Sequence, residues 1–212
     1  MPGDTLGPDQ IISSNSVALG AYIETLGGTP INLGIARDTE DSLRGVFEGA
    51  RGADLLITMG GASVGDYDFV RKVLSAEGMD LGFYRVAMRP GKPLIFGHLG
   101  GVPVLGLPGN PVSAGVTSAI FLQAAMAVML GLENGGNAPA AALLGRDLGP
   151  NDFRQDYLRA TLTTDANGNL VATPFERQDS SMMERLAKAD CLVVRPPEAP
   201  AAAKGDRAEI VM

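Results

Sequence analysis

The residues with the clearest chemical potential form a glycine-rich run from Gly60 to Asp68, GGASVGDYD, which follows an apolar stretch and precedes a helix-type segment. Glycines allow backbone N–H groups to approach an anion, and a helix N-terminus adds partial positive charge. Ser63 adds a hydroxyl donor, while Asp66 and Asp68 add carboxylates that imply an intervening cation, most simply Mg²⁺. The run is therefore either an anion-and-metal site or a tight turn with capping aspartates. Its spacing is neither the dinucleotide fingerprint nor the P-loop.

A second turn of this kind, LPGNPVS, runs from Leu107 to Ser113. Pro111 suits the first position of a helix, and Asn110 suits the N-cap with its side chain facing outward. The turn is either a second anion or base pocket or simply a well-capped helix start.

A third acidic position, Asp38, follows the apolar run that ends at Ile35. Ligands bind at the carboxyl edge of an open α/β sheet, so Asp38 and Asp68 are expected at one edge. There they could share a metal or hold a polar ligand. Helix capping before Thr39 explains Asp38 equally well.

Two cations, Arg89 and Lys92, lie in the loop RPGKP of an otherwise acidic chain. A rigid loop with two positive charges suits an oxyanion or a pyrophosphate, and a solvated turn is the alternative. The single histidine, His98, and the single cysteine, Cys191, are interpreted as structural.

Strand-type and helix-type runs alternate along the first part of the chain and would position these residues. Strands are predicted at 11–13, 30–35, 54–59, 83–88, 93–96 and 102–107. Helices are predicted after Ser14, from Thr39 to about Arg51, over 69–76 and from Pro111. The pattern predicts an α/β domain over residues 3–134, with a mostly parallel sheet and helices on both faces.

The segment from Glu133 to Pro139, ENGGNAP, is rich in turn residues and is the best candidate domain boundary. Short β-type segments follow at 141–144, 157–163, 170–173, 191–194 and 208–211, with a hairpin signal at 165–169. Residues 138–212 are therefore predicted to form a small all-β domain, a barrel or a sandwich.

Composition excludes several classes of protein. The 212 residues are 45% hydrophobic and carry a net charge of −7 without a basic block, which argues against nucleic-acid binding. One His and one Cys exclude a zinc site of the His/Cys type. We expect no secretory signal, because the first residues lack a basic and an apolar region. The uncharged stretch Val112 to Leu132 is long enough to span a bilayer but is better explained as a buried helix. We expect a cytoplasmic protein that binds no membrane.

Taken together, three motifs resemble one known family. The glycine run from Gly60 to Asp68, the loop from Arg89 to Pro93, and GLPGNPVS from Gly106 to Ser113 are similar to the molybdopterin-binding domain of molybdopterin molybdotransferases, the MoeA and gephyrin E-domain family. NLGIARD, from Asn32 to Asp38, fits the same pattern. So does RQDYLR, from Arg154 to Arg159, followed by QDSS.

The resemblance implies a transferase that inserts molybdate into adenylylated molybdopterin and releases AMP and molybdenum cofactor. It implies Asp38 and Asp68 as the catalytic, metal-associated pair, with Mg²⁺ or another divalent cation. The residues implied for the pterin-nucleotide site are Gly60, Gly61, Ser63, Gly65, Pro108, Gly109, Asn110 and Ser113. Those implied for the oxyanion are Arg89, Lys92, Arg159 and Ser180 or Ser181.

The resemblance also implies a homodimer, and the molybdopterin adenylyltransferase as a further partner. Family members carry additional domains before the segment that starts here near Gly3, so the chain is expected to supply the C-terminal half of the enzyme. Two alternatives stay open. One is the adenylyltransferase itself, which resembles only the first domain, and the other is a non-catalytic molybdopterin-binding or scaffold module.

Overall fold

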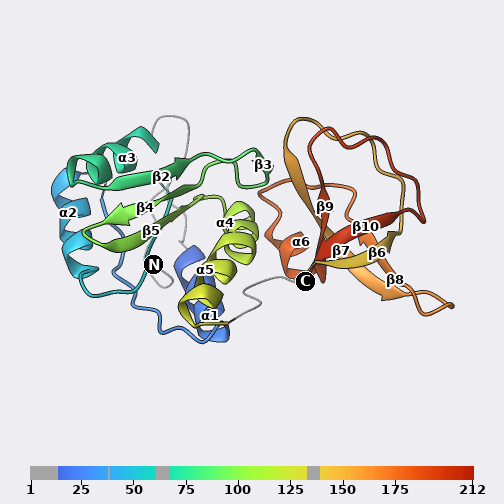
Figure 1. Ribbon diagram of the computed structural model, residues 1–212, viewed down its shortest axis with the longest axis horizontal. Helices are drawn as coiled ribbons and strands as arrows, with labels where there is room; N and C mark the ends of the chain where they lie inside the picture. Colours follow the sequence, from blue (N-terminus) through green and yellow to red (C-terminus); the bar gives the residue numbers. More distant parts are fainter. Residues whose placement is uncertain (1–13, 38, 61–66, 133–138) are drawn as a thin grey trace, which may run out of the picture. The chain divides into compact units, whose positions relative to one another are not determined.

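The computed structural model describes residues 14–37, 39–60, 67–132 and 139–212, with only the backbone of 67–69 (Figure 1). The chain divides into two compact units, residues 1–85 with 93–114, and residues 86–92 with 115–212. The boundary expected between residues 134 and 138, and the strand expected at 11–13, lie outside the described residues.

A four-stranded mixed sheet forms the centre of the first unit. Its strands, in spatial order, are β1 (Leu56–Met59), β5 (Val102–Leu107), β4 (Ile95–Leu99) and β2 (Asp80–Tyr84). β1 and β5 are parallel, whereas the β5–β4 and β4–β2 pairs are antiparallel. The prediction of a mostly parallel sheet with helices on both faces is therefore wrong.

The connection between β4 and β5 explains the mixed sheet. It consists of Gly100 and Gly101, whose φ angles are +57° and +86°. A two-residue link with positive φ at both positions forms a tight hairpin, whereas parallel strands need a crossover of a dozen or more residues. The Gly-Gly pair therefore makes these strands antiparallel.

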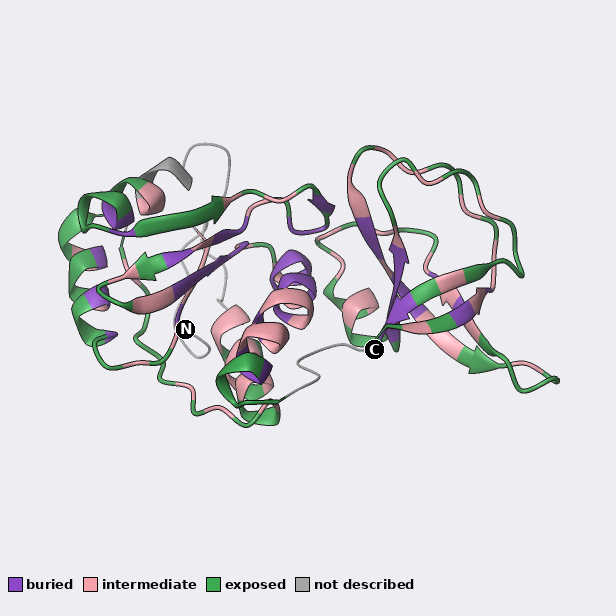
Figure 2. Cartoon of the chain, in the orientation of Figure 1, coloured by how far each residue is buried: buried purple, intermediate pink, exposed green. Residues whose placement is uncertain are grey.

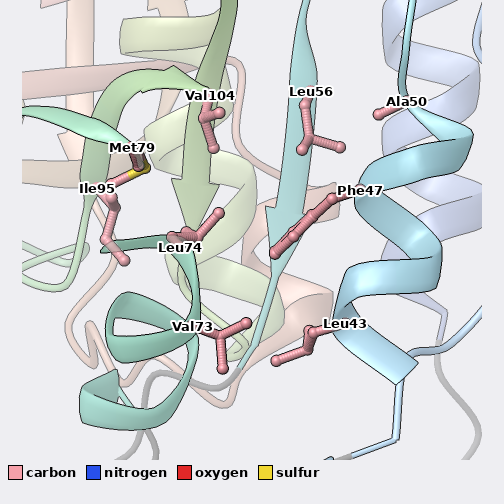
Figure 3. Packing of buried hydrophobic residues seen from close by; sticks show 9 residues of the cluster. All are labelled: Leu43, Phe47, Ala50, Leu56, Val73, Leu74, Met79, Ile95 and Val104. Carbon is pink, nitrogen blue, oxygen red and sulfur yellow. The ribbon is translucent and has the colours of Figure 1, made fainter. Parts of the chain in front are cut away.

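Two helices pack on this sheet and enclose its core. α2 (Glu40–Gly49) begins at Thr39, whose side chain accepts a hydrogen bond from the Ser42 amide at 3.3 Å. α3 (Tyr67–Ala76) follows β1. Figure 3 shows their apolar side chains meeting those of the strands, and the cluster consists of Leu43, Phe47, Ala50, Leu56, Val73, Leu74, Met79, Ile95 and Val104.

The segment predicted as a strand at 30–35 has no regular structure, so this prediction is wrong. The side chain of Asn32 accepts a hydrogen bond from the Gly34 amide at 2.9 Å, and Gly34 has φ +86°. An Asn side chain that bonds two residues ahead makes a local turn, which interrupts an extended run.

A continuous helical segment follows β5 and contains most of the uncharged stretch. It comprises α4 (Pro111–Thr117), a π-helical turn η1 (Ser118–Leu122) and α5 (Gln123–Met129). Its length and mean hydropathy of 1.7 would suffice to cross a membrane, but half of the apolar window is buried inside the protein. Core helices of soluble proteins have the same properties. A further helix of the first unit, α1 (Asn15–Thr25), has no buried residue.

The second unit contains a closed barrel. Its strands are β6 (Ala140–Leu144), β7 (Gln155–Thr164), β8 (Leu170–Pro174), β9 (Cys191–Arg195) and β10 (Arg207–Val211). They follow the order β7-β8-β6-β10-β9, and β9 pairs again with β7. β9 is buried from Cys191 to Val194 (Figure 2). A short strand, β3 (Met88–Arg89), pairs with β7, and one short helix, α6 (Met183–Ala187), precedes β9.

Candidate functional site

Two of the predicted turns lie against each other where β1 and β5 end. Gly60 has φ +87°, and its amide donates to the Leu107 carbonyl at 3.3 Å. A Cβ atom on Gly109 would lie 3.0 Å from the Gly60 Cα, closer than most Cβ contacts, so the neighbouring backbone would have to shift by a few tenths of an ångström. Gly109 is therefore favoured by the close approach of the two backbones and Gly60 by its positive φ, and the register of β1 and β5 places them side by side.

Polar side chains hold the second turn in place. Asn110 is the N-cap of α4, since its side chain accepts from the Val112 amide at 3.3 Å. Pro108 and Ser113 are buried. Asn15, at the start of α1, donates to the Gly109 carbonyl at 2.7 Å. The sequence predicted only that a helix follows Ser14, because nothing local signals a partner for Asn15 that lies 94 residues away.

Much of the predicted anion-and-metal site lies outside the described residues. This applies to Asp38, Gly61, Ser63, Gly65 and the side chain of Asp68. In the described parts of the chain, no group of three or more His, Cys, Asp or Glu side chains could hold a metal ion. The Mg²⁺ site therefore stays a prediction.

The loop that carries Arg89 and Lys92 is attached to the barrel. The Val86 amide closes it by donating to the Lys92 carbonyl at 3.0 Å. Gly91 is required inside it, because a Cβ there would lie 2.4 Å from the Thr117 methyl group. Lys92 is exposed. Both predicted cations therefore belong to the second unit and not to the sheet domain that surrounds them in sequence.

Arg89 is paired with carboxylates, a state that its loop sequence did not indicate. Its guanidinium forms an ion pair with Asp156 and a longer one, 3.4 Å, with Asp152. It also donates to the Asn151 side chain at 3.4 Å. Arg154 binds Asp152 more closely, at 2.6 Å, and this contact lowers the pKa of Asp152 to about 2.

Arg159 is fully buried in the barrel unit, with 0% of its surface exposed. Its Nη2 donates to the Asp179 carbonyl at 3.2 Å, whereas Nε and Nη1 have no partner among the described residues. Burial lowers the pKa of this guanidinium, and the nearby Asp179 carboxylate opposes the shift. An arginine remains protonated in proteins nonetheless, so the site holds a buried cation with uncommitted N–H donors.

Neighbouring side chains fix the backbone around Arg159. Gln178 accepts from the Arg159 amide at 3.0 Å and donates to the Arg159 and Phe175 carbonyls, both at 2.9 Å. Asp179 accepts from the Ser181 amide at 2.8 Å and the Ser181 hydroxyl at 2.7 Å, which lowers the pKa of Asp179. Gln178 has a positioning function that its sequence context did not reveal.

Comparison with known proteins identifies similar sequences over nearly the whole chain. Residues 1–127 match the family described as "Probable molybdopterin binding domain", and residues 141–212 match "MoeA C-terminal region (domain IV)". The chain is 35% identical to a molybdopterin molybdenumtransferase of Bacillus subtilis, over 91% of its own length and 45% of the relative. It is 31% identical to molybdopterin molybdenumtransferase 2 of Mycobacterium tuberculosis, over 99% and 52% respectively.

A solved structure shows the same fold. It is the "molybdopterin biosynthesis moea protein from Pyrococcus horikosii", with a TM-score of 0.83 and 30% identity, and the match covers 100% of this chain and 51% of that one. The chain therefore spans about half the length of the curated relatives and of the solved structure that it matches.

Proposed function

This chain belongs to the molybdopterin-binding domain family, with a MoeA C-terminal region joined to it, and from this premise we propose that it works as the C-terminal half of a molybdopterin molybdotransferase. The reaction is the insertion of molybdate into adenylylated molybdopterin, with release of AMP and molybdenum cofactor. The substrates are thus a small dianion and a pterin nucleotide.

The buried guanidinium of Arg159 carries the proposal. A buried charge without a carboxylate partner is costly, and an oxyanion that accepts from Nε and Nη1 would satisfy both donors at once. A guanidinium suits a tetrahedral dianion because its N–H donors lie in one plane with fixed spacing. Arg159 therefore holds molybdate, together with Arg89, Lys92 and a hydroxyl from Ser180 or Ser181.

The paired turns of the first unit bind the pterin nucleotide. Gly60 and Gly109 let the two turns approach each other with no side chain between them, beside the N-terminus of α4. Asn110 and Ser113 add polar side chains beside the N-terminus of α4. Gly61, Ser63, Gly65 and Pro108 complete this part of the proposal.

A divalent cation, most simply Mg²⁺, would be held by Asp38 and Asp68 and would neutralise charge on the phosphoanhydride. The positive charges that face the oxyanion would come from Arg159, Arg89 and Lys92. The positive charge that faces the nucleotide phosphates would come from the metal. We further propose a homodimer in the cytoplasm, with the molybdopterin adenylyltransferase as a partner that delivers the nucleotide.

Calorimetric titration of the chain tests the function. We expect Arg159→Ala to weaken molybdate binding by at least tenfold, while the affinity for an adenylylated pterin or nucleotide analogue changes little. Arg207→Ala, which removes one exposed charge from β10, is the matched control and should change neither affinity. Equal losses for both ligands, or none for molybdate, would contradict the assignment.

Mass spectrometry of the ligand that co-purifies with the chain separates the alternatives. Adenylylated molybdopterin supports the molybdotransferase, molybdopterin alone supports the adenylyltransferase, and no ligand supports a scaffold module. The match of residues 141–212 to the MoeA C-terminal region already disfavours the adenylyltransferase, which resembles only the first domain.

A further inference from the structure

A row of alternating charges crosses three neighbouring strands of the barrel unit. Arg89 on β3 is the register partner of Asp156 on β7, and Asp156 is also the register partner of Arg195 on β9. These three residues line one pocket. Arg195 is committed elsewhere, since its Nη2 donates to the carbonyls of Gly149 and Pro200. Asp156 therefore interacts chiefly with Arg89.

Asp156 is unusually buried for a carboxylate. Its side chain is only 5% exposed, whereas that of Arg89 is 48% exposed. One carboxylate oxygen, Oδ2, accepts from Arg89 Nη2, and Oδ1 has no partner among the described residues. Burying a carboxylate with only one of its oxygens paired costs free energy. Loss of the ion pair with Arg89 would cost more, so this pair holds the Asp156 and Arg89 side chains in place.

The contacts of Arg89 leave part of its guanidinium available. Asp156 and Asn151 accept from Nη2, and Asp152 accepts from Nη1 at 3.4 Å. In the described part of the chain nothing accepts from Nε. The guanidinium is thus held at both Nη atoms, most closely at Nη2, while its Nε donor has no acceptor among the described residues and about half of the side chain is exposed.

We propose that Asp156 is the positioning residue that orients Arg89 for the oxyanion. This inference rests on the proposed function and adds a residue to which no role was assigned. Asp156 carries a negative charge, so it cannot serve to raise the positive charge for an anion. Its contribution is geometric, because its ion pair with Nη2 fixes the orientation of the guanidinium while Nε keeps no acceptor among the described residues.

This geometric function predicts an effect opposite in sign to simple electrostatics. Asp156→Asn removes a negative charge near the site, which by charge alone would strengthen the binding of a dianion. We expect molybdate binding instead to weaken about tenfold. Residues that orient a binding side chain through a hydrogen bond typically change affinity by ~10–100-fold, and this estimate is the lower limit. Asp152→Asn makes the same change in charge at a group that mainly binds Arg154, and should leave affinity equal or higher.

A double-mutant cycle tests whether Asp156 acts through Arg89. Molybdate affinity is measured for the unaltered chain, Asp156→Asn, Arg89→Ala and the double variant, with near-UV circular dichroism to confirm folding. We expect Asp156→Asn to have no further effect once Arg89 is absent. Independent losses that add in the double variant, or tighter binding by Asp156→Asn, would overturn the inference.

A second measurement needs no ligand. The Nε–H resonance of Arg89 can be assigned by its absence in Arg89→Lys. Its NMR order parameter should be high in the unaltered chain, as for a fixed side chain, and low in Asp156→Asn. An unchanged resonance overturns the positioning inference. Failure of the unaltered chain to bind molybdate overturns the proposed function instead, so the two failures are distinguishable.

Discussion

Replacement of Arg159 by methionine should make the protein more stable while it destroys molybdate binding. Arg159 is fully buried, and two of its donor nitrogens lack partners among the described residues. Methionine is also unbranched and flexible, and it fills irregular gaps in a core. Replacing a buried charge with an apolar residue of similar volume is often stabilising, by ~1–4 kcal/mol.

The contacts of Arg159 allow a narrower estimate. Each unsatisfied buried donor costs ~1–3 kcal/mol, and the variant removes two such nitrogens. It also loses the hydrogen bond from Nη2 to the Asp179 carbonyl, ~1.5–3 kcal/mol for a charged donor. The backbone bonds to Gln178 remain. We therefore expect a net gain of about 2 kcal/mol in the free energy of unfolding, or ~4–8 °C in Tm for a chain of this size.

Thermal unfolding and calorimetric titration with molybdate are the assays. The control is Arg207→Met, where an exposed charge is lost and Tm should change by less than about 1 °C. A fall in Tm for Arg159→Met would mean that Nε and Nη1 are satisfied in the absence of molybdate. Retained molybdate affinity would refute the role of Arg159 in the oxyanion site.

Three further perturbations address other parts of the molecule. Gly109→Ala should lower the free energy of unfolding by ~1–3 kcal/mol and weaken nucleotide binding, because its Cβ would lie 3.0 Å from the Gly60 Cα. Gly149→Ala is the control, since it has open space around it, and urea unfolding should show no change in its stability. Asp68→Asn, introduced into a full-length relative, should abolish metal-dependent molybdate insertion at a cost of at most ~1–2 kcal/mol in stability; wild-type turnover would contradict the metal assignment. Since the pKa of Asp152 is lowered from 3.8 to about 2, its stabilising contribution is present above pH 4 and is lost as pH falls through 2, which a carboxyl NMR titration would show as a midpoint near 2.

Several features of this protein follow from local sequence. A glycine run after an apolar strand and before a helix identifies a turn that can approach an anion, and the Pro-Gly-Asn-Pro turn identifies a capped helix start. The structure places Gly60 and Gly109 of these two turns next to each other. Such signals can be predicted because turns, caps and helix starts depend on residues within a few positions of each other.

The topology could be predicted only in part. The hairpin link at Gly100 and Gly101 was visible in the sequence, but alternation of strand and helix runs favoured a parallel sheet. Likewise, the apolar run at 30–35 has strand composition, and one Asn side chain with a following glycine makes it a turn. At the Gly100–Gly101 link and at residues 30–35, local turn-forming residues determined the structure, and the hydrophobic pattern alone predicted it wrongly.

The state of the charged residues was decided by tertiary structure alone. The sequence gives no sign of a partner for Arg89, because its buried partner, Asp156, is 67 residues away on a strand that pairs with β3. Arg159 could be named from a motif, but only the closed barrel buries it with two donor nitrogens unpaired among the described residues. Whether an arginine is paired, exposed or left with free donors depends on which strands become neighbours and in which register. That information resides in contacts between distant segments, which no local pattern encodes.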